Sequence, residues 1–199
     1  MSVRLTRIYT KTGDMGSTKL GDMSDVRKTD VRLAAYADVD EANSVIGTAL
    51  ALGTLTTELR EVLLAVQNDL FDVGADLCTP VVKNPPFLPI RLSEDYVTRL
   101  EGHCDTFNAR LDTLNSFILP GGTAGAALLH HARTVVRRAE RSTWALLEAD
   151  AERTNAICAR YLNRLSDLLF ILARAANADG DILWKPRANA SEEGPVTQP

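Results

Sequence analysis

The sequence predicts an all-α protein, a bundle of five helices preceded by an irregular N-terminal segment. Three observations lead to this prediction. Apolar residues recur at three- and four-residue intervals in five separate stretches of the 199-residue chain. The connections between these stretches are short or rich in proline and glycine, and none shows a convincing strand pattern. Alanine and leucine are abundant, whereas aromatic residues make up only 6% of the chain, which favours helices.

The first two helices follow the irregular segment, which covers residues 1–29. Thr29 or Asp30 can cap the first helix, because both side chains accept hydrogen bonds from backbone N–H groups. Gly53 is a plausible end for this helix. The second helix is predicted over residues 57–77, where leucines and valines recur at helical spacing.

Three more helices are predicted in the second half of the chain. Four prolines mark residues 79–89 as a loop. Ser93 is the expected N-cap of the third helix, which runs to about residue 111. The fourth helix is predicted over residues 123–151, after a Pro-Gly-Gly turn, and the fifth over residues 155–177.

We expect residues 1–185 to form a single domain, with residues 1–29 as an N-terminal loop segment and residues 30–185 as the helical bundle. Residues 186–199 have little apolar content and are predicted to be a mobile tail. The fifth helix is apolar over most of its circumference, which predicts burial in the bundle or in a subunit interface; we favour an oligomer. Its only polar stripe consists of Arg160, Asn163, Arg164 and Asp167.

Composition excludes several classes of function. A formal charge of −4 argues against nucleic acid as the main partner. The three cysteines form no C-x-x-C pair, so a disulfide framework or a zinc site is not expected. His130 and His131 point about 100° apart on a helix and are predicted to be polar surface residues rather than metal ligands. No signal peptide or membrane-spanning stretch is evident, so we expect a soluble, cytoplasmic protein.

A run of arginines in the fourth helix is the strongest indication of a binding site. Arg133, Arg137 and Arg141 are four residues apart and therefore lie on one helical face, where like charges repel. An anionic ligand facing them would relieve this repulsion. The alternative is a solvated basic stripe. A glycine-rich segment near the N-terminus and the polar stripe of the fifth helix favour a polyphosphate site shared between a loop and two helices.

The glycine-rich segment spans residues 10–17. Gly13 and Gly16 let backbone N–H groups approach an anion closely. The hydroxyl and ammonium groups near them belong to Thr10, Lys11, Thr12, Ser17 and Lys28. The glycine spacing matches neither a P-loop nor a dinucleotide-binding fingerprint. An ordinary turn is the alternative.

Three further side chains are candidates for the site. Asp40 falls in an otherwise apolar seam of the first helix, where a buried carboxylate needs a partner such as Arg133; a surface carboxylate is the alternative. Phe117 precedes the Pro-Gly-Gly turn, which would hold its ring at the mouth of the arginine helix, unless it is a plain core residue. Glu140 could orient a neighbouring arginine or hold a metal ion on the phosphates.

Six motifs in register resemble one known family. They are Thr10-Lys-Thr-Gly-Asp-x-Gly16, Lys28-Thr-Asp30, Asp40-Glu-x-Asn43, Phe117-Ile-Leu-Pro-Gly-Gly122, Arg137-Arg-x-Glu-Arg141 and Tyr161-Leu-Asn-Arg-Leu-Ser-Asp167. Together they closely resemble the PduO-type ATP:cob(I)alamin adenosyltransferases over roughly residues 4–185. Ser17 stands where threonine is common, and Ala37 and Ala42 stand where glycine and leucine are frequent, which affects packing more than chemistry.

The resemblance implies a ferritin-like, up-and-down five-helix bundle assembled as a homotrimer, with active sites between subunits. It implies transfer of the 5′-deoxyadenosyl group of ATP to the cobalt of reduced cobalamin, with Mg²⁺ on the phosphates and triphosphate as the other product. A flavoprotein reductase and a B12-dependent mutase are the partners that would supply the substrate and use the product. Two alternatives stay open: a carrier that delivers adenosylcobalamin without turnover, and a purely structural bundle.

The resemblance also assigns residues. The ATP loop would comprise Thr10, Lys11, Thr12, Gly13, Asp14, Gly16, Ser17 and Lys28. The opposing wall, contributed by the neighbouring subunit, would comprise Arg137, Arg138, Glu140, Arg141 and Asn163. Arg133 resembles the arginine paired with the first-helix aspartate, here Asp40. Phe117 resembles the ring that excludes the lower axial ligand of cobalamin.

Overall fold

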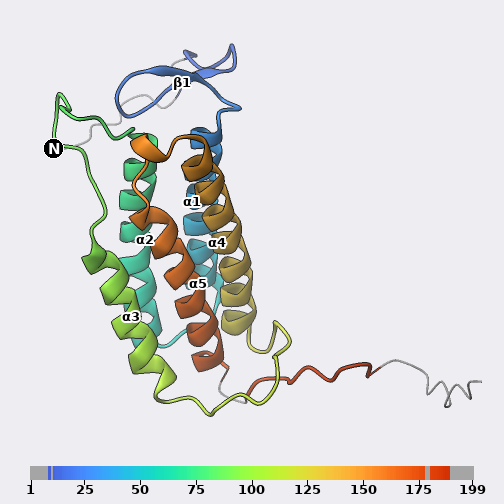
Figure 1. Cartoon of the computed structure of the whole chain (residues 1–199). Helices are drawn as coiled ribbons and strands as arrows, with labels where there is room; N and C mark the ends of the chain where they lie inside the picture. Colours follow the sequence, from blue (N-terminus) through green and yellow to red (C-terminus); the bar gives the residue numbers. More distant parts are fainter. Residues whose placement is uncertain (1–8, 10, 178–179, 189–199) are drawn as a thin grey trace, which may run out of the picture.

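Five α-helices standing side by side form the molecule in the computed structural model, which describes residues 9, 11–177 and 180–188 (Figure 1). The helices are α1 (Val31–Leu52), α2 (Thr57–Cys78), α3 (Glu94–Asn108), α4 (Ala124–Ala149) and α5 (Ile157–Ala175), with a 3-10 turn at Ala151–Arg153. Their directions alternate along the chain (Figure 1). The predicted all-α, up-and-down bundle is therefore confirmed. None of the described helices is both long enough and apolar enough to cross a membrane.

Around the bundle the helices follow the order α2, α1, α4, α5, α3, because α1 packs against both α2 and α4, and α5 against both α4 and α3. The apolar seams predicted for the fifth helix face the core. Tyr161, Leu162, Leu165, Leu168, Leu169 and Leu172 are all fully buried. Since its own chain already buries α5, the apolar circumference of this helix gives no reason to expect an oligomer.

The helix ends depart little from the prediction. Asp30 rather than Thr29 caps α1, because its carboxylate accepts the N–H of Arg32 at 2.8 Å. Gly53 ends that helix, as predicted. Ser93 occupies the N-cap of α3 without a capping hydrogen bond from its side chain, and this helix ends at Asn108, three residues before the predicted residue 111.

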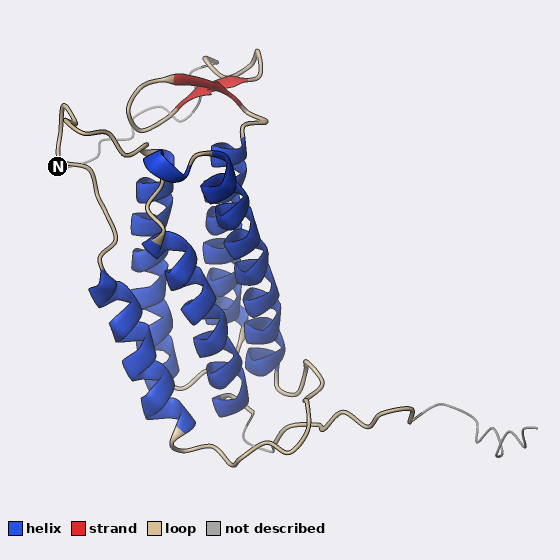
Figure 2. Cartoon of the chain, in the orientation of Figure 1, coloured by secondary structure: helices blue, strands red, loops and turns tan. Residues whose placement is uncertain are grey.

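A small antiparallel hairpin in the N-terminal segment was not predicted. Strand β1 (Ser17–Lys19) pairs with β2 (Asp25–Arg27), and Figure 2 shows the pair above the ends of the helices. Each strand has only three residues and little apolar content, so the sequence carries no alternating pattern that could reveal it. Gly16 leads into β1 with a φ of +79°, a left-handed conformation that favours glycine.

The prediction for His130 was wrong. Its side chain is buried, with 3% exposure, and its ring meets the ring of Phe170 edge-on at 6.0 Å. Burial, with the nearby Arg133 guanidinium, lowers the pKa of His130. His131 is exposed, as expected. Of the predicted mobile tail, residues 186–188 are exposed and residues 189–199 lie outside the described part of the chain.

Candidate functional site

The face formed by α4 and α5 carries a cationic hollow. Arg133 and Arg137 line a space of about 390 Å³ together with Ser166, Asp167, Phe170 and Ile171. The Nε atom of Arg133 is buried and has no hydrogen-bond partner in the part of the chain that the structure describes. Burial and the neighbouring Arg137 guanidinium lower the pKa of Arg133. A half-buried cation with an unmet donor beside a second cation favours an anionic ligand.

Two more predicted residues extend this face. The side-chain amide of Asn163 on α5 donates a hydrogen bond to the Glu140 carboxylate on α4 at 3.1 Å. Arg141, one turn beyond Arg137, is exposed. The structure therefore brings Arg133, Arg137, Glu140 and Asn163 together between the same two helices, as the sequence predicted.

Arg138 lies apart from this group. Its guanidinium forms ion pairs with Glu41 and, at 3.5 Å, with Asp38, so it joins α4 to α1. The arginines in the polar stripe of α5 are also paired. Arg160 contacts Glu94 at 2.5 Å and Arg164 contacts Glu101 at 3.2 Å, both on α3. Within one chain these three guanidinium groups serve helix packing rather than the cationic hollow.

An apolar hollow adjoins the cationic one. It has a volume of about 600 Å³ and is lined by Leu114, Asn115, Ser116, Phe117, Phe170, Trp184 and Pro186. Phe117 is 78% exposed, so it is not a core residue. Phe170 lines both hollows, which places the arginines and the Phe117 ring on either side of one aromatic side chain.

The segment after α5 holds Phe117 in place. The Trp184 N–H donates to the Phe117 carbonyl at 2.7 Å, and the Leu119 N–H donates to the Ile182 carbonyl at 2.8 Å. The rings of Phe117 and Trp184 lie 6.1 Å apart in an edge-on arrangement. The Phe117 ring is therefore presented to the hollow by a backbone that is fixed on both sides.

Sequence reasoning missed Phe170 and Trp184. Phe170 lies three residues after Asp167 and so falls on the polar stripe of α5, where helical periodicity could have identified it as a partly exposed aromatic. For Trp184 the sequence offers no comparable signal, because its contact with Phe117 joins segments far apart in the chain.

The glycine-rich segment forms tight turns before the hairpin. The Gly16 N–H donates to the Gly13 carbonyl at 3.2 Å, and the Lys28 N–H donates to the Gly16 carbonyl at 2.9 Å. The ammonium group of Lys28 lies over the turn, 3.0 Å from where a Cβ on Gly13 would be. Lys11 adopts a left-handed conformation, with φ of 63°. These contacts bring Lys28 together with the residues around Gly13; Thr10 lies outside the described residues.

The glycine-rich segment and the loop between α3 and α4, whose residues 114–117 line the apolar hollow, lie at opposite ends of α4 (Figure 1). The hairpin that follows the glycine-rich segment meets Arg153, just beyond the C-terminus of α4, through an ion pair with Asp22 at 3.7 Å. Phe117 precedes Thr123, the N-cap of the same helix. With 26 residues, α4 is about 39 Å long. One chain therefore does not bring its own glycine-rich segment to its own apolar hollow.

Asp40 and Arg133 do not form the expected pair within one chain. Asp40 is exposed and lines a groove of about 320 Å³ between α1 and α2, together with Tyr36, Asn43 and Phe71. Arg133 faces α5 instead. No ion pair joins the two among the described residues, because they lie in grooves on different sides of the bundle.

Comparisons with known proteins give a consistent result. The family model described as cobalamin adenosyltransferase matches residues 8–176. A corrinoid adenosyltransferase from Mycobacterium tuberculosis is 62% identical over 186 residues, covering 94% of this chain and 96% of the relative. One from Bacillus subtilis is 42% identical over 184 residues, covering 88% of this chain and 89% of the relative.

Solved structures agree with the sequence comparisons. A variant of a PduO-type ATP:corrinoid adenosyltransferase from Lactobacillus reuteri, complexed with cobalamin and ATP, superposes with a TM-score of 0.84. It is 37% identical in sequence, and the match covers 90% of this chain and 97% of that one. Another variant of that enzyme, complexed with ATP, has a TM-score of 0.80 at 38% identity and covers 89% of this chain and 100% of that one.

Proposed function

This chain belongs to the cobalamin adenosyltransferase family, and from that premise we propose how its residues perform the reaction. The protein is an ATP:corrinoid adenosyltransferase: it transfers the 5′-deoxyadenosyl group of ATP to the cobalt of reduced cobalamin and releases triphosphate. The observation that carries this function is the pair of adjoining hollows, one cationic and one apolar, that share Phe170. They suit a polyphosphate and a large apolar ring system respectively.

The cationic hollow binds the triphosphate group of ATP. Arg137 is exposed, so it can bond phosphate oxygens through charge-assisted hydrogen bonds. Arg141 and Asn163 extend the same wall. Lys28 and the backbone N–H groups around Gly13 form the opposing side of the nucleotide site. Arg138 is not assigned to the wall, because its carboxylate partners already engage it.

Phe117 controls the coordination of the cobalt. Its exposed ring projects into the apolar hollow, where it would occupy the lower axial side of the corrin and exclude water and the axial base. A cobalt(II) centre without its axial ligand is more easily reduced to the nucleophilic cobalt(I) state. Phe170 and Trp184 complete an apolar wall that keeps water from this side.

The reaction itself needs no protein nucleophile. Cobalt(I) supplies an electron pair to C5′ of ATP, a Co–C bond forms, and the C5′–O bond breaks with its electrons passing to the triphosphate. The reduced cobalamin therefore carries the difficult chemistry, and the protein supplies orientation and charge. Negative charge grows on the leaving group in the transition state, where Arg137 and Arg141 stabilise it most effectively.

A magnesium ion fits the nucleotide site. Mg²⁺ in nucleotide enzymes commonly has one or two carboxylate ligands, phosphate oxygens and water. Glu140 places one carboxylate beside the arginines, and Asn163 holds it through the 3.1 Å hydrogen bond. Among the described residues no cluster of three or more acidic, histidine or cysteine side chains could bind a metal without the phosphates. When bound, the ion would neutralise part of the triphosphate charge.

Two chains together form the active site. The glycine-rich segment of one chain lies beyond one end of α4, a helix about 39 Å long, and its own apolar hollow lies beyond the other, so a neighbouring chain has to provide one of the two. Asp40 and Arg133, which cannot meet within a chain, would pair across the same interface. The family resemblance implies a homotrimer, and we infer it for this chain: a head-to-tail contact of different surfaces closes into a ring when its rotation divides a full turn.

An anaerobic absorbance assay tests the function. Purified protein with MgATP and chemically reduced cobalamin is expected to form a light-sensitive alkylcobalamin, with triphosphate released in equal amount. Cobalamin that stays bound without ATP-dependent product would indicate a carrier, and neither binding nor product would leave only a structural bundle. A cytoplasmic location, a flavoprotein reductase that supplies cobalt(I) and a B12-dependent mutase that takes the product fit this activity.

A further inference from the structure

We propose that Gly21 is a positioning residue, which seats the hairpin on the end of α2 and so determines where the glycine-rich segment meets ATP. The anchor for this contact consists of the backbone of Cys78 and Thr79 together with Arg153. The inference rests on the proposed role of the glycine-rich segment in ATP binding. It adds residues that do not touch the nucleotide themselves.

The contact at Gly21 leaves no room for a side chain. Its N–H donates to the Cys78 carbonyl, the last of α2, at 3.0 Å. A Cβ on Gly21 would lie 2.1 Å from the Thr79 hydroxyl oxygen and 3.3 Å from the Thr79 Cα. Even alanine would therefore have to push the hairpin away from the helix end or displace Thr79. Only glycine allows this backbone to approach so closely.

The turn that contains Gly21 is held rigidly. Leu20 is 6% exposed, and its N–H donates to the Ser24 carbonyl at 2.9 Å. The Asp22 carboxylate accepts both the N–H and the hydroxyl of Ser24, at 3.0 and 2.5 Å. A rigid turn transmits a displacement along β1, which begins immediately after Gly16. A shift at Gly21 therefore moves the phosphate-binding turn.

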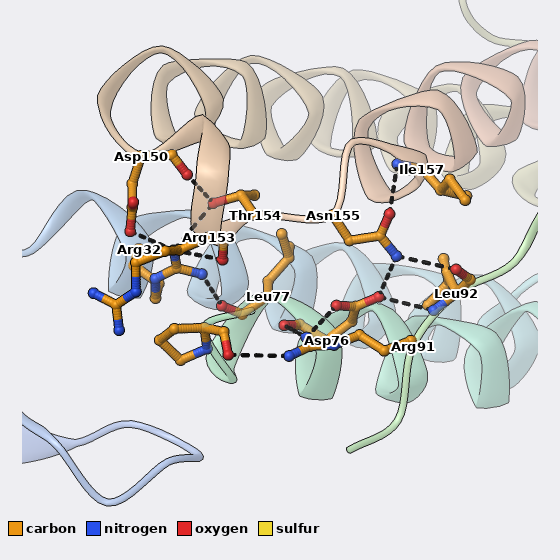
Figure 3. Close-up of polar contacts among 11 residues, drawn as sticks. Arg32, Asp76, Leu77, Arg91, Leu92, Asp150, Arg153, Thr154, Asn155 and Ile157 are labelled. Atoms are coloured by element: carbon orange, nitrogen blue, oxygen red, sulfur yellow. Dashed lines mark hydrogen bonds and ion pairs between the residues drawn. The ribbon is translucent and has the colours of Figure 1, made fainter. Parts of the chain in front are cut away.

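The anchor is itself fixed by a buried cation. Arg32 is 3% exposed, and Figure 3 shows its guanidinium between the ends of α2 and α4. It donates to the Leu77 carbonyl at 2.8 Å, to the Asp150 carboxylate at 2.9 Å and to the Arg153 carbonyl at 3.2 Å. A buried charge so fully bonded holds its neighbours in a single arrangement. Arg153 in turn contacts Asp22 of the hairpin at 3.7 Å.

This arrangement predicts different effects on the binding of the two substrates, ATP and cobalamin. The anchor lies at the end of the bundle that carries the glycine-rich segment, and the loop between α3 and α4, which lines the Phe117 hollow, lies at the other end (Figure 1). A change at Gly21 should therefore affect the Michaelis constant for ATP and leave that for cobalamin unchanged. If Gly21 had a merely structural role, the substitution would instead lower the melting temperature and raise the Michaelis constants for both substrates alike.

The test is a cycle of three variants, Gly21→Ala, Thr79→Gly and the double variant. Gly21→Ala is expected to raise KM for ATP on the order of tenfold, since misplacing a positioning group by about 1 Å can reduce rates by up to 100-fold. Thr79→Gly alone should leave both KM values within about twofold of wild type. Its melting temperature should stay within a few degrees of wild type. The double variant should recover the wild-type KM for ATP, because removal of the Thr79 side chain makes room for the new methyl group.

Each other outcome overturns the proposal. An unchanged KM for ATP in Gly21→Ala would show that the close contact does not position the segment. A raised KM that Thr79→Gly fails to restore would show that the contact with Thr79 is not the cause. Equal loss for both substrates would indicate general destabilisation. Lys28→Ala, measured in parallel, separates this inference from the proposed function, because an unchanged KM for ATP there would refute the nucleotide role of the segment itself.

Discussion

Phe117→Ala is expected to lose most turnover, on the order of 100-fold in kcat, while ATP binds with unchanged affinity. The ring is exposed and lines the apolar hollow, whereas the arginines line the cationic one, so its removal leaves the triphosphate site intact. Without the ring, water or the axial base can reach the lower face of the cobalt and disfavour the reduced state. Steady-state kinetics and calorimetric titration with ATP measure the two quantities separately.

Leu119→Ala is the matched control for Phe117→Ala. Leu119 is an exposed apolar residue of the same segment, but it does not line the hollow. Its backbone hydrogen bond with Ile182 survives the substitution. We expect wild-type turnover for this variant. A loss of ATP affinity as large as the loss of turnover in Phe117→Ala would contradict the separation of roles between the two hollows.

Arg137→Ala is expected to weaken ATP binding at least tenfold, because a hydrogen bond to a charged group contributes about 1.5–3 kcal/mol. Turnover should fall further, by about 100- to 1,000-fold, the range seen when a donor to developing negative charge is removed. Arg137→Lys keeps the charge but loses the paired guanidinium donors, so an intermediate loss is expected. ATP affinity by calorimetry and single-turnover rates measure the two effects.

A control for loss of charge is available just after the C-terminal end of α3. Arg110 is exposed, forms an ion pair with Glu58 at 2.8 and 3.0 Å, and lies over the Phe107 ring. Arg110→Ala removes one positive charge as Arg137→Ala does, and we expect unchanged ATP affinity and turnover. If Arg137→Ala retained wild-type ATP affinity, its role in phosphate binding would be wrong.

The sequence predicted the helices well because they depend on local patterns. Apolar spacing located all five, and the caps at Asp30 and Thr123 have the residue types that helix starts favour. The hairpin was missed because its polar, three-residue strands are held by contacts of Gly21 with the end of α2, which no local pattern encodes. His130 was predicted to lie on the surface because two adjacent histidines on a helix are typical of a polar face. Packing against Phe170 buries it instead.

In the candidate site, too, features that depend on local spacing were predicted and features that depend on contacts between distant segments were not. Helical spacing alone placed Arg133 and Arg137 on one face, and the structure confirms it. The distinct position of Arg138 depends on Asp38 and Glu41 in a different helix, so the Arg137-Arg138 sequence could not reveal it. Asp40 and Arg133 line different grooves of one chain, so the pair that the sequence suggested does not form within it.

Subunit complementation tests most directly the central claim, that two chains build each site. Lys28→Ala damages the glycine-rich segment and Arg137→Ala damages the arginine wall. Each variant alone should be nearly inactive. Co-expressed with different tags and purified as mixed trimers, the two should recover about a third of wild-type adenosyl transfer, because one of the three interfaces in each mixed head-to-tail ring joins an intact segment to an intact wall. Mixed oligomers with no activity above that of the separate variants would contradict a site shared between chains.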